Sequence, residues 1–295
     1  MRKRLAAFWS ANVWKMSFSF RRFFLNWLSV FAIIWTILDF VLFFFGNNGV
    51  SAWKPPVWLV LVTGILIAIW MSRPRLTRVV KRDDLDVTIR LTVDDLFRIK
   101  GFTAIIPVNT SFKHDHVDGG AVLIQYRDKY YPEVAAFDRQ LQASLLNEPT
   151  PNIVDIGTAQ RKEYPIGTVV RLETPEAPFR SAYLIATAKL NEYNRAIPDR
   201  SDLQTGLKAI WSYIALRGRK EPLVIPIVGS GRHRITANRL ELLDDIVTSF
   251  LAAVERNKFT EQLTIVIHPS AFLRNAYSMD EMEEYIRFRC KFGVD

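Results

Sequence analysis

Two apolar runs near the N-terminus most constrain what this chain can fold into. They extend from Phe23 to Phe45 and from about Trp53 to Met71, and a short loop separates them. A helix needs about 20 apolar residues to cross the hydrocarbon core of a bilayer. The sequence therefore predicts a transmembrane hairpin over residues 23–73, with spans at about 23–45 and 53–71.

Basic residues flank both apolar runs. Eleven Lys and Arg residues precede the first run or follow the second, whereas the loop at 46–55 has only Lys54. Short flanks that are rich in Lys and Arg stay on the cytoplasmic side of a membrane. We therefore expect two spans with both termini cytoplasmic. Asp39 lies within the first run, where it would face either a bundle interior or water at the outer interface.

The net charge of +9 is concentrated near the N-terminus. Residues 1–82 hold twelve basic residues and one acidic residue, whereas residues 83–295 hold 27 basic and 29 acidic residues. A nucleic-acid-binding protein carries its excess positive charge on the folded domain, so we expect no nucleic-acid partner. We interpret residues 1–22 as an amphipathic basic cytoplasmic segment, or alternatively a disordered tail, and residues 74–82 as a basic linker.

The cysteine and histidine content argues against disulfide and metal sites. Cys290 is the only cysteine, so no internal disulfide can form. His114 and His116 could approach one metal ion, but two ligands on a loop without a third make a weak site. We interpret both as solvated loop histidines and expect no metal.

Residues 83–295 alternate between strand-like and helix-like patterns. We expect strands at 85–91, 102–108, 169–172, 182–186, 223–228 and 263–267, and helices starting near 121, 201, 238 and 280. Ser201 with Gln204 resembles a capping box that opens the second of these helices. The alternation predicts an α/β domain, with helices on both faces of a mixed, mostly parallel sheet. The ligand site of such a fold lies beyond the carboxyl ends of the strands.

Glycines follow two of the expected buried strands. Asn109-Thr110-Ser111 and then Asp118-Gly119-Gly120 come after the first, and Gly229-Ser230-Gly231-Arg232-His233 comes after the second. Glycine lets backbone N–H groups approach an anion, and a helix N-terminus favours negative charge. Each turn alone is more often structural, but two at neighbouring strands would bind a diphosphate. Neither matches the Walker or the six-residue dinucleotide motif.

These segments carry a resemblance to macro domains, which are α/β modules that bind ADP-ribose. The matching segments are Val93–Phe97, Ala104–Asn109, Gly119–Gly120, Tyr164–Thr168 and Leu223–Gly231. More narrowly, the domain resembles the diverged macro domain of effectors of the Thoeris anti-phage system. Two spans ahead of it resemble the membrane-anchored form of that effector. The resemblance implies a three-layer α/β/α domain at 83–295 on the cytoplasmic side.

The resemblance also implies the binding residues. Asp95 would accept a hydrogen bond from the adenine amino group, and Asn109 would face the distal ribose. The two diphosphate loops would contain the glycines, with Arg232 adding a charge-assisted contact. The full expected binding set is Asp95, Asn109, Thr110, Ser111, Asp118, Gly119, Gly120, Gly229, Ser230, Gly231, Arg232 and His233. Asp95 could instead be a solvated helix cap, and Arg232 a solvent-facing charge.

The resemblance favours a sensor over an enzyme. Hydrolytic macro domains usually carry a second asparagine shortly after the first and a longer glycine run, whereas this chain has Phe112 and only Gly119-Gly120. We therefore expect no catalytic residues and no cofactor. The alternatives are a membrane-tethered ADP-ribosyl hydrolase, with His116 or Asp118 as a base, a reader of ADP-ribosylated proteins, and a structural membrane anchor.

The resemblance further implies a signalling route. A TIR-domain enzyme would make an ADP-ribose derivative from NAD, with histidine-ADP-ribose favoured as the ligand. The bound domains would form a homo-oligomer at the bacterial inner membrane. Clustering of their hairpins would then disrupt the lipid bilayer and abort infection.

Overall fold

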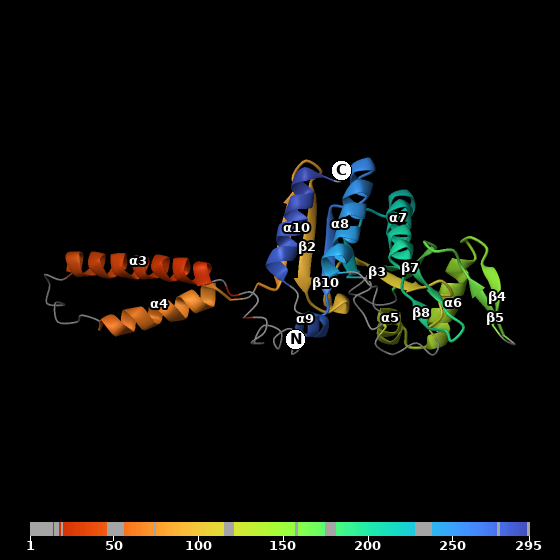
Figure 1. The fold of residues 1–295 in the computed structure, drawn as a ribbon, viewed down its shortest axis with the longest axis horizontal. Helices are drawn as coiled ribbons and strands as arrows, with labels where there is room; N and C mark the ends of the chain where they lie inside the picture. The colour runs from red at the N-terminus through yellow and green to blue at the C-terminus, as the bar shows by residue number, and fades with distance from the viewer. Residues whose placement is uncertain are drawn as a thin grey trace. The chain divides into compact units, whose positions relative to one another are not determined.

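A computed structural model gives the fold of the chain (Figure 1). It describes residues 14, 18, 20–45, 56–73, 75–114, 121–156, 159–174, 181–227, 238–275 and 278–293. Most of the amphipathic segment predicted at 1–22 lies outside these residues. The chain divides into two compact units, one of Met1–Leu76 with Ala276–Ser278 and one of Thr77–Asn275 with Met279–Asp295.

The first unit contains two apolar helices, α3 (Phe20–Phe45) and α4 (Val57–Met71). Within α3, Phe20–Val41 is long and apolar enough to cross a membrane, whereas α4 is a shorter apolar helix. The 15 residues of α4 extend only about 22 Å at the rise of an α-helix. Trp53, at the start of the second predicted span, lies outside the described residues. By length and composition, the described residues therefore contain one candidate span.

Small side chains on α4 allow the two helices to pack closely. Val60, Gly64 and Ala68 follow one another at intervals of four, and they are the buried residues of α4. A Cβ placed on Gly64 would lie 3.7 Å from the indole Nε1 of Trp27, which is an ordinary van der Waals contact and shows that this position faces α3. Small residues at this spacing are typical of helix contacts in membranes. At the end of α4, the amide of Asn26 donates to the Ser72 hydroxyl at 3.2 Å.

The second unit is built on an eight-stranded sheet. Its order is β1-β2-β10-β9-β3-β7-β6, with β8 paired to β7. The strands are β1 (Thr77–Arg82), β2 (Val87–Val93), β3 (Thr103–Asn109), β6 (Val169–Glu173), β7 (Ser181–Leu190), β8 (Ala196–Ile197), β9 (Leu223–Pro226) and β10 (Gln262–Ile267). The pairings from β2 to β7 are parallel and those at both edges are antiparallel. The predicted mixed, mostly parallel sheet is confirmed.

Helices cover both faces of this sheet (Figure 1). One layer contains α7 (Arg200–Arg217), α8 (Arg239–Arg256) and α10 (Met279–Phe292), and the other contains α5 (Val122–Tyr130) and α6 (Val134–Leu145). The short helix α9 (Pro269–Asn275) follows β10. In β3, Ala104, Ile106 and Val108 pack into the core cluster that includes residues of α5 and α6. The α/β/α layering predicted from the sequence is present.

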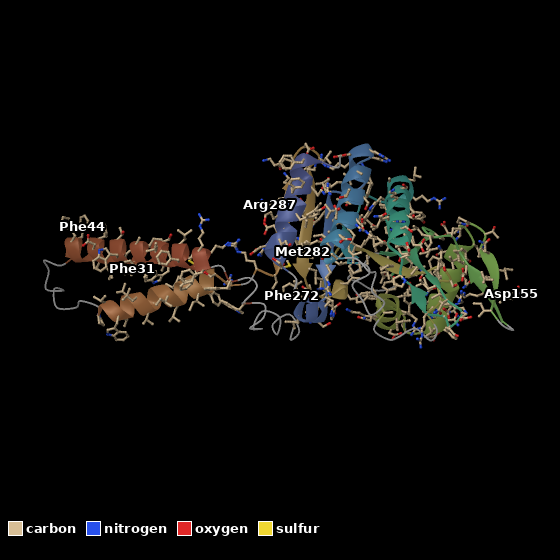
Figure 2. All side chains as sticks on the ribbon, in the orientation of Figure 1. Phe31, Phe44, Asp155, Phe272, Met282 and Arg287 are labelled. Atoms are coloured by element: carbon tan, nitrogen blue, oxygen red, sulfur yellow. The ribbon has the colours of Figure 1, made fainter. Side chains whose placement is uncertain are left out.

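The inward face of α10 is apolar and includes the only cysteine of the chain. Met279, Met282, Ile286 and Cys290 are buried, whereas Arg287 is exposed on the opposite side (Figure 2). Burial raises the pKa of the Cys290 thiol to about 11. Cys290 therefore acts as a core residue of the fold.

Strand β1 corrects the prediction of a basic linker at 74–82. Residues 77–82 pair with β2 over their whole length. Arg78 is buried, and its guanidinium lies 2.6 Å from Asp280 and 2.6 Å from Glu283 of α10. The charge of Arg78, which made this segment resemble a membrane flank, is therefore neutralised inside the fold by acidic residues far along the chain.

The predicted capping box at Ser201 is also wrong. Asp199 caps α7, because its Oδ1 accepts hydrogen bonds from the N–H groups of Ser201 at 2.7 Å and Asp202 at 3.1 Å. Gln204 instead donates to Asp245 of α8 at 2.8 Å. A carboxylate is a strong acceptor for the free N–H groups of a helix N-terminus, and the neighbouring helix provides a partner for Gln204.

A two-stranded hairpin was not predicted from the sequence. It is formed by β4 (Asn152–Ile156) and β5 (Ala159–Glu163). Arg161 anchors it, donating to the carbonyl oxygens of Leu190 and Asn191 at 2.8 Å each and pairing with Glu163. Because Leu190 and Asn191 are distant in the chain, the local pattern around Arg161 does not indicate its role.

Candidate functional site

The candidate site lies at the carboxyl ends of the parallel strands β2, β10, β9 and β3. β3 and β9 are direct neighbours, with Thr103 opposite Leu223 and Ala104 opposite Val224. The two strands that precede the predicted glycine turns therefore end at the same edge of the sheet. The turns themselves, which contain Asp118, Gly119, Gly120, Gly229, Ser230, Gly231, Arg232 and His233, lie outside the described residues.

Asp95 lies at this edge, just after β2. Its Oδ1 accepts the N–H of Phe97 at 3.0 Å and so caps the 3-10 helix η1 (Leu96–Arg98). Among the described residues, no donor reaches its second carboxylate oxygen. Burial, together with the negative charge of Asp95, raises the pKa of Tyr130 to about 12. Asp95 is therefore a helix cap that retains an acceptor beside aromatic side chains.

Asn109 ends β3 and bonds to the turn that follows it. Its Oδ1 accepts the N–H groups of Ser111 and Lys113 at 3.1 Å each, and its Nδ2 donates to the carbonyl of Lys113 at 2.8 Å. Phe112 adopts a φ of +52°, which is uncommon for a residue with a side chain. The aromatic ring of Phe112 is buried edge-to-face against Tyr164, with the ring centroids 5.5 Å apart.

Two hydroxyl groups in this turn are buried without a partner in the described part of the chain. They are Thr110 Oγ1 and Ser111 Oγ. The backbone of Thr110 is fully engaged, because its N–H donates to Ala188 at 2.9 Å and its carbonyl accepts from Tyr164 at 2.8 Å. A buried polar atom without a hydrogen bond requires an explanation, such as a water, an ion or a ligand.

His114 corrects the interpretation of a solvated loop histidine. Its side chain is 6% exposed. Arg127 of α5 approaches Nδ1 at 2.7 Å, and Asp138 of α6 approaches Nε2 at 2.6 Å. Arginine can only donate, so Nδ1 accepts, and a neutral His114 carries its proton on Nε2 and donates to Asp138. The partners lie 13 and 24 residues away, with no motif that indicates the network.

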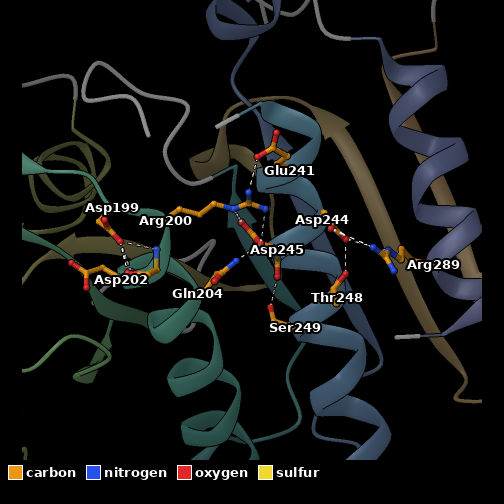
Figure 3. A network of polar contacts seen from close by, with 11 residues as sticks. Asp199, Arg200, Asp202, Gln204, Glu241, Asp244, Asp245, Thr248, Ser249 and Arg289 are labelled. Atoms are coloured by element: carbon orange, nitrogen blue, oxygen red, sulfur yellow. Dashed lines mark hydrogen bonds and ion pairs between the residues drawn. The ribbon is translucent and has the colours of Figure 1, made fainter. Parts of the chain in front are cut away.

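A polar network fixes the N-terminus of α8, the helix that follows the second predicted glycine turn (Figure 3). Arg200 of α7 donates to Glu241 at 2.6 Å and to Asp245 at 2.8 Å. An anion near this helix end would be repelled by these carboxylates, and Arg200 offsets their charge. Asn238 caps the helix and accepts the N–H of Leu240 at 3.3 Å.

The same network continues from α8 to α10. Burial opposes ionisation of Asp244, but hydrogen bonds from Thr248 and Tyr285 and the charge of Arg289 outweigh it and lower the pKa of Asp244. Thr248 Oγ1 donates to Asp244 at 2.6 Å, and Arg289 Nε lies 3.2 Å from Asp244 (Figure 3). Helix α8 is therefore held from both sides.

The structure groups the expected site residues only in part. Asn109, Thr110 and Ser111 form one turn at the end of β3, whereas Asp95 lies at the end of β2, three strand spacings away. Strands in a sheet lie about 4.8 Å apart, so these two points are separated by roughly 14 Å along the edge. Among the described residues, no three His, Cys, Asp or Glu side chains are grouped to hold a metal ion.

A comparison with solved structures finds a similar α/β/α fold in a macrodomain. An asparagine-to-alanine mutant of the Oceanobacillus iheyensis macrodomain matches with a TM-score of 0.51 at 14% identity, covering 72% of this chain and 94% of that chain. The same macrodomain with MES bound matches with a TM-score of 0.49 at 15% identity, covering 72% and 98%. At such identity the likeness concerns the fold alone.

A third solved structure is the Trypanosoma brucei macrodomain in complex with ADP-ribose. It matches with a TM-score of 0.44 at 11% identity, covering 68% of each chain. Among curated proteins, no match was found.

The sequence itself matches a family model. The model is described as the macro domain of the Thoeris protein ThsA, and it matches residues 89–268. This range begins within β2 and ends just after β10, and so includes most of β2 and the whole of the other parallel strands of the sheet. Since it covers more than half of the chain, the chain belongs to the macro domain family of the Thoeris protein ThsA.

Proposed function

We propose that this protein is a membrane-anchored effector of a Thoeris anti-phage system whose macro domain senses an ADP-ribose conjugate. The family match over residues 89–268 carries this proposal. The adjacency of β3 and β9 supports it, because loops that follow neighbouring parallel strands meet at one edge of the sheet and together can bind a diphosphate. Histidine-ADP-ribose, made from NAD by a TIR-domain enzyme, is the proposed ligand.

The geometry of the strand ends supports an extended dinucleotide-like ligand. Asp95 and the turn at Asn109 are separated by β10 and β9, which corresponds to roughly 14 Å. A ligand lying across these strand ends would place its adenine near Asp95, its diphosphate over β9 and its second ribose near β3. The free carboxylate oxygen of Asp95 would then accept the adenine amino group.

We propose binding without turnover. Phe112 stands close to where hydrolytic macro domains have a second asparagine, and its ring is buried against Tyr164. This places an apolar group beside Asn109 where a hydrolase would need a polar one. Ligand would therefore act by its different affinity for two states of the protein, and we propose that the bound state favours assembly.

The membrane-anchored form is proposed from the two apolar helices and the basic flanks. Two helices cannot enclose a pore, so disruption of the bilayer would require several subunits. Asp39 is exposed on α3, and acidic side chains within membrane spans usually face a bundle interior or water. In an assembly of hairpins, Asp39 would lie between subunits.

Binding is tested by calorimetry on the full chain in lipid nanodiscs. The titrated ligands are ADP-ribose, histidine-linked ADP-ribose and NAD. Each ligand is recovered afterwards, and its mass is measured by mass spectrometry. The proposal expects tight binding of the histidine conjugate and recovery of intact ligand. Turnover would instead indicate a hydrolase, and binding of none of the three would overturn the sensing function.

Output at the membrane is tested separately. Liposomes that contain the full chain and a trapped dye should leak when the ligand is added. The Asp39→Ala variant should bind the ligand with unchanged affinity and cause no leakage. Wild-type leakage from this variant would remove Asp39 from the mechanism, and leakage without ligand would contradict ligand gating.

A further inference from the structure

We propose that Asn109 is a positioning residue, which holds the turn after β3 in its binding conformation and does not contact the second ribose of the ligand. This inference rests on the proposed function and assigns Asn109 a different part in it. The side chain of Asn109 is already committed, because Oδ1 accepts two N–H groups, from Ser111 and Lys113, and Nδ2 donates to the carbonyl of Lys113.

The hydrogen-bonding capacity of Asn109 supports this role. An amide oxygen has two lone pairs, and the two N–H groups at 3.1 Å occupy both. One amide hydrogen is used at 2.8 Å. A ribose hydroxyl that donated to Oδ1 would have to displace a bond of the turn. The side chain therefore orders residues 109–113, and within the described residues only the second hydrogen of Nδ2 stays unused.

The turn is one that requires such support. Phe112 has a φ of +52°, a conformation that persists in a residue with a side chain only when its surroundings impose it. The three Asn109 bonds hold the backbone on both sides of Phe112, and the ring of Phe112 packs on Tyr164. At the far end of the turn, His114 is fixed between Arg127 and Asp138.

The result of this support is the placement of two hydroxyls. Thr110 Oγ1 and Ser111 Oγ lie between the two fixed ends of the turn, and they are buried without partners in the described part of the chain. A rigid turn keeps both from finding partners within the protein. On this basis they, and not the amide of Asn109, are the groups of this turn that meet the ligand, and they meet it at the diphosphate, which ADP and ADP-ribose both carry.

A comparison of ADP with ADP-ribose separates positioning from contact, because ADP lacks the second ribose. Both are titrated by calorimetry into the full chain in nanodiscs, as wild type and as Asn109→Ala. A positioning role predicts that Asn109→Ala weakens both ligands by the same factor, about tenfold. The ratio of the two affinities should stay within about twofold of wild type.

Asn191 provides a matched control. Its Oδ1 accepts the N–H groups of Tyr193 and Arg195 at 2.9 Å each. Like Asn109, it therefore accepts from the residues two and four positions further along the chain. Asn194 in that turn also has a left-handed φ, of +57°. Asn191→Ala should alter thermal stability as Asn109→Ala does and leave both affinities unchanged.

A second variant keeps the test valid if Asn109→Ala does not fold. Asn109→Asp retains an acceptor for both N–H groups and loses only the donation to Lys113. It should weaken both ligands equally and less than Asn109→Ala does. Its added negative charge affects the shared diphosphate in both ligands and so leaves the ratio intact.

Three results would overturn the inference. A selective loss of ADP-ribose binding in Asn109→Ala, with ADP unchanged, would show a ribose contact. Unchanged affinity for both ligands would show that the hydrogen bonds of the Asn109 side chain have no effect on the site. An equal loss in Asn191→Ala would show that the effect is general destabilisation. Failure of the wild type to bind either ligand would instead overturn the proposed function.

Discussion

The two ends of β3 present polar side chains in opposite states. At the amino end, Thr103 donates to Glu221 at 2.5 Å, and Arg171 donates to Ser181 at 3.2 Å and lies 3.6 Å from Glu221. Thr103 and Ser181 are themselves 3.3 Å apart. These four side chains pair with one another inside the protein, although Arg171 Nε has no hydrogen-bond partner in the described part of the chain and only faces Glu173 at 3.3 Å. The amino end therefore contributes to stability.

At the carboxyl end, polar groups of similar kind are left open. The oxygen atoms Thr110 Oγ1 and Ser111 Oγ are buried but have no partner in the described part of the chain. Burial of a polar side chain therefore does not by itself indicate its role. Whether that side chain has a hydrogen-bond partner within the protein does. A buried polar group without a hydrogen-bond partner lowers stability, and we attribute the two hydroxyls at this end to contact with the ligand.

The largest expected effect is a loss of stability caused by a substitution at the amino end of β3. Glu221→Ala removes the carboxylate that Thr103 and Arg171 share, and it leaves a mostly buried guanidinium without this partner. We expect a loss of about 3 kcal/mol in the free energy of unfolding, measured by urea denaturation, with no change in affinity for ADP-ribose. A loss below about 1 kcal/mol, or a parallel loss of affinity, would contradict the comparison.

A paired substitution on one strand tests the contrast directly. Thr110→Val removes a hydroxyl that has no partner and should leave the free energy of unfolding unchanged or raise it by up to about 1 kcal/mol. Its affinity for ADP-ribose should fall by about fivefold to tenfold. Thr103→Val should do the reverse, with about 1–2 kcal/mol lost and affinity kept. If both variants changed stability and affinity in the same way, the two ends of β3 would not differ in function.

The smallest effect concerns a polar network near the carboxyl edge that is fully partnered. The pKa of Asp244 is lowered in the folded state, so its contribution to stability is present above the ordinary pKa of about 4 and is lost as pH falls through the lower folded value. Asp244→Asn should therefore reduce stability near neutral pH and flatten its decline in acid. Urea midpoints between about pH 2 and pH 7 measure both.

The Asp244→Asn variant also tests whether the polar network at α8 serves stability or ligand binding. If Asp244→Asn lowered ligand affinity more than stability, the network at α8 would belong to the binding site. The division would then lie between Thr110 and α8, and not between the two ends of the sheet. An unchanged acid profile would contradict the role given to Arg289.

The sequence predicts the strands better than the contacts between them. β3, β9 and β10 are apolar, β-branched runs that are buried on both faces, and such runs are recognisable locally. β1 was missed because Arg78 and Arg82 resemble a membrane flank. Their partners, Asp280, Glu283 and Glu255, lie on α10 and α8, so only long-range packing shows that the segment is a strand.

The candidate site was predictable to a similar degree. The position of Asn109 at the end of a buried strand follows from the local pattern and the family resemblance. Its hydrogen bonds do not, because the turn at 109–113 contains no glycine to indicate a left-handed residue. His114 was misinterpreted because its loop is polar, and the two helices that bury it are known only once the chain has folded.

The burial of Cys290 has a practical consequence for experiments. With its thiol pKa raised to about 11, the native protein presents little thiolate at neutral pH, and no other cysteine is present. A cysteine introduced at an exposed position, such as Leu216, can therefore be labelled selectively without altering the core. Spin or fluorescent probes attached there would report the separation between copies of the chain before and after ligand is added.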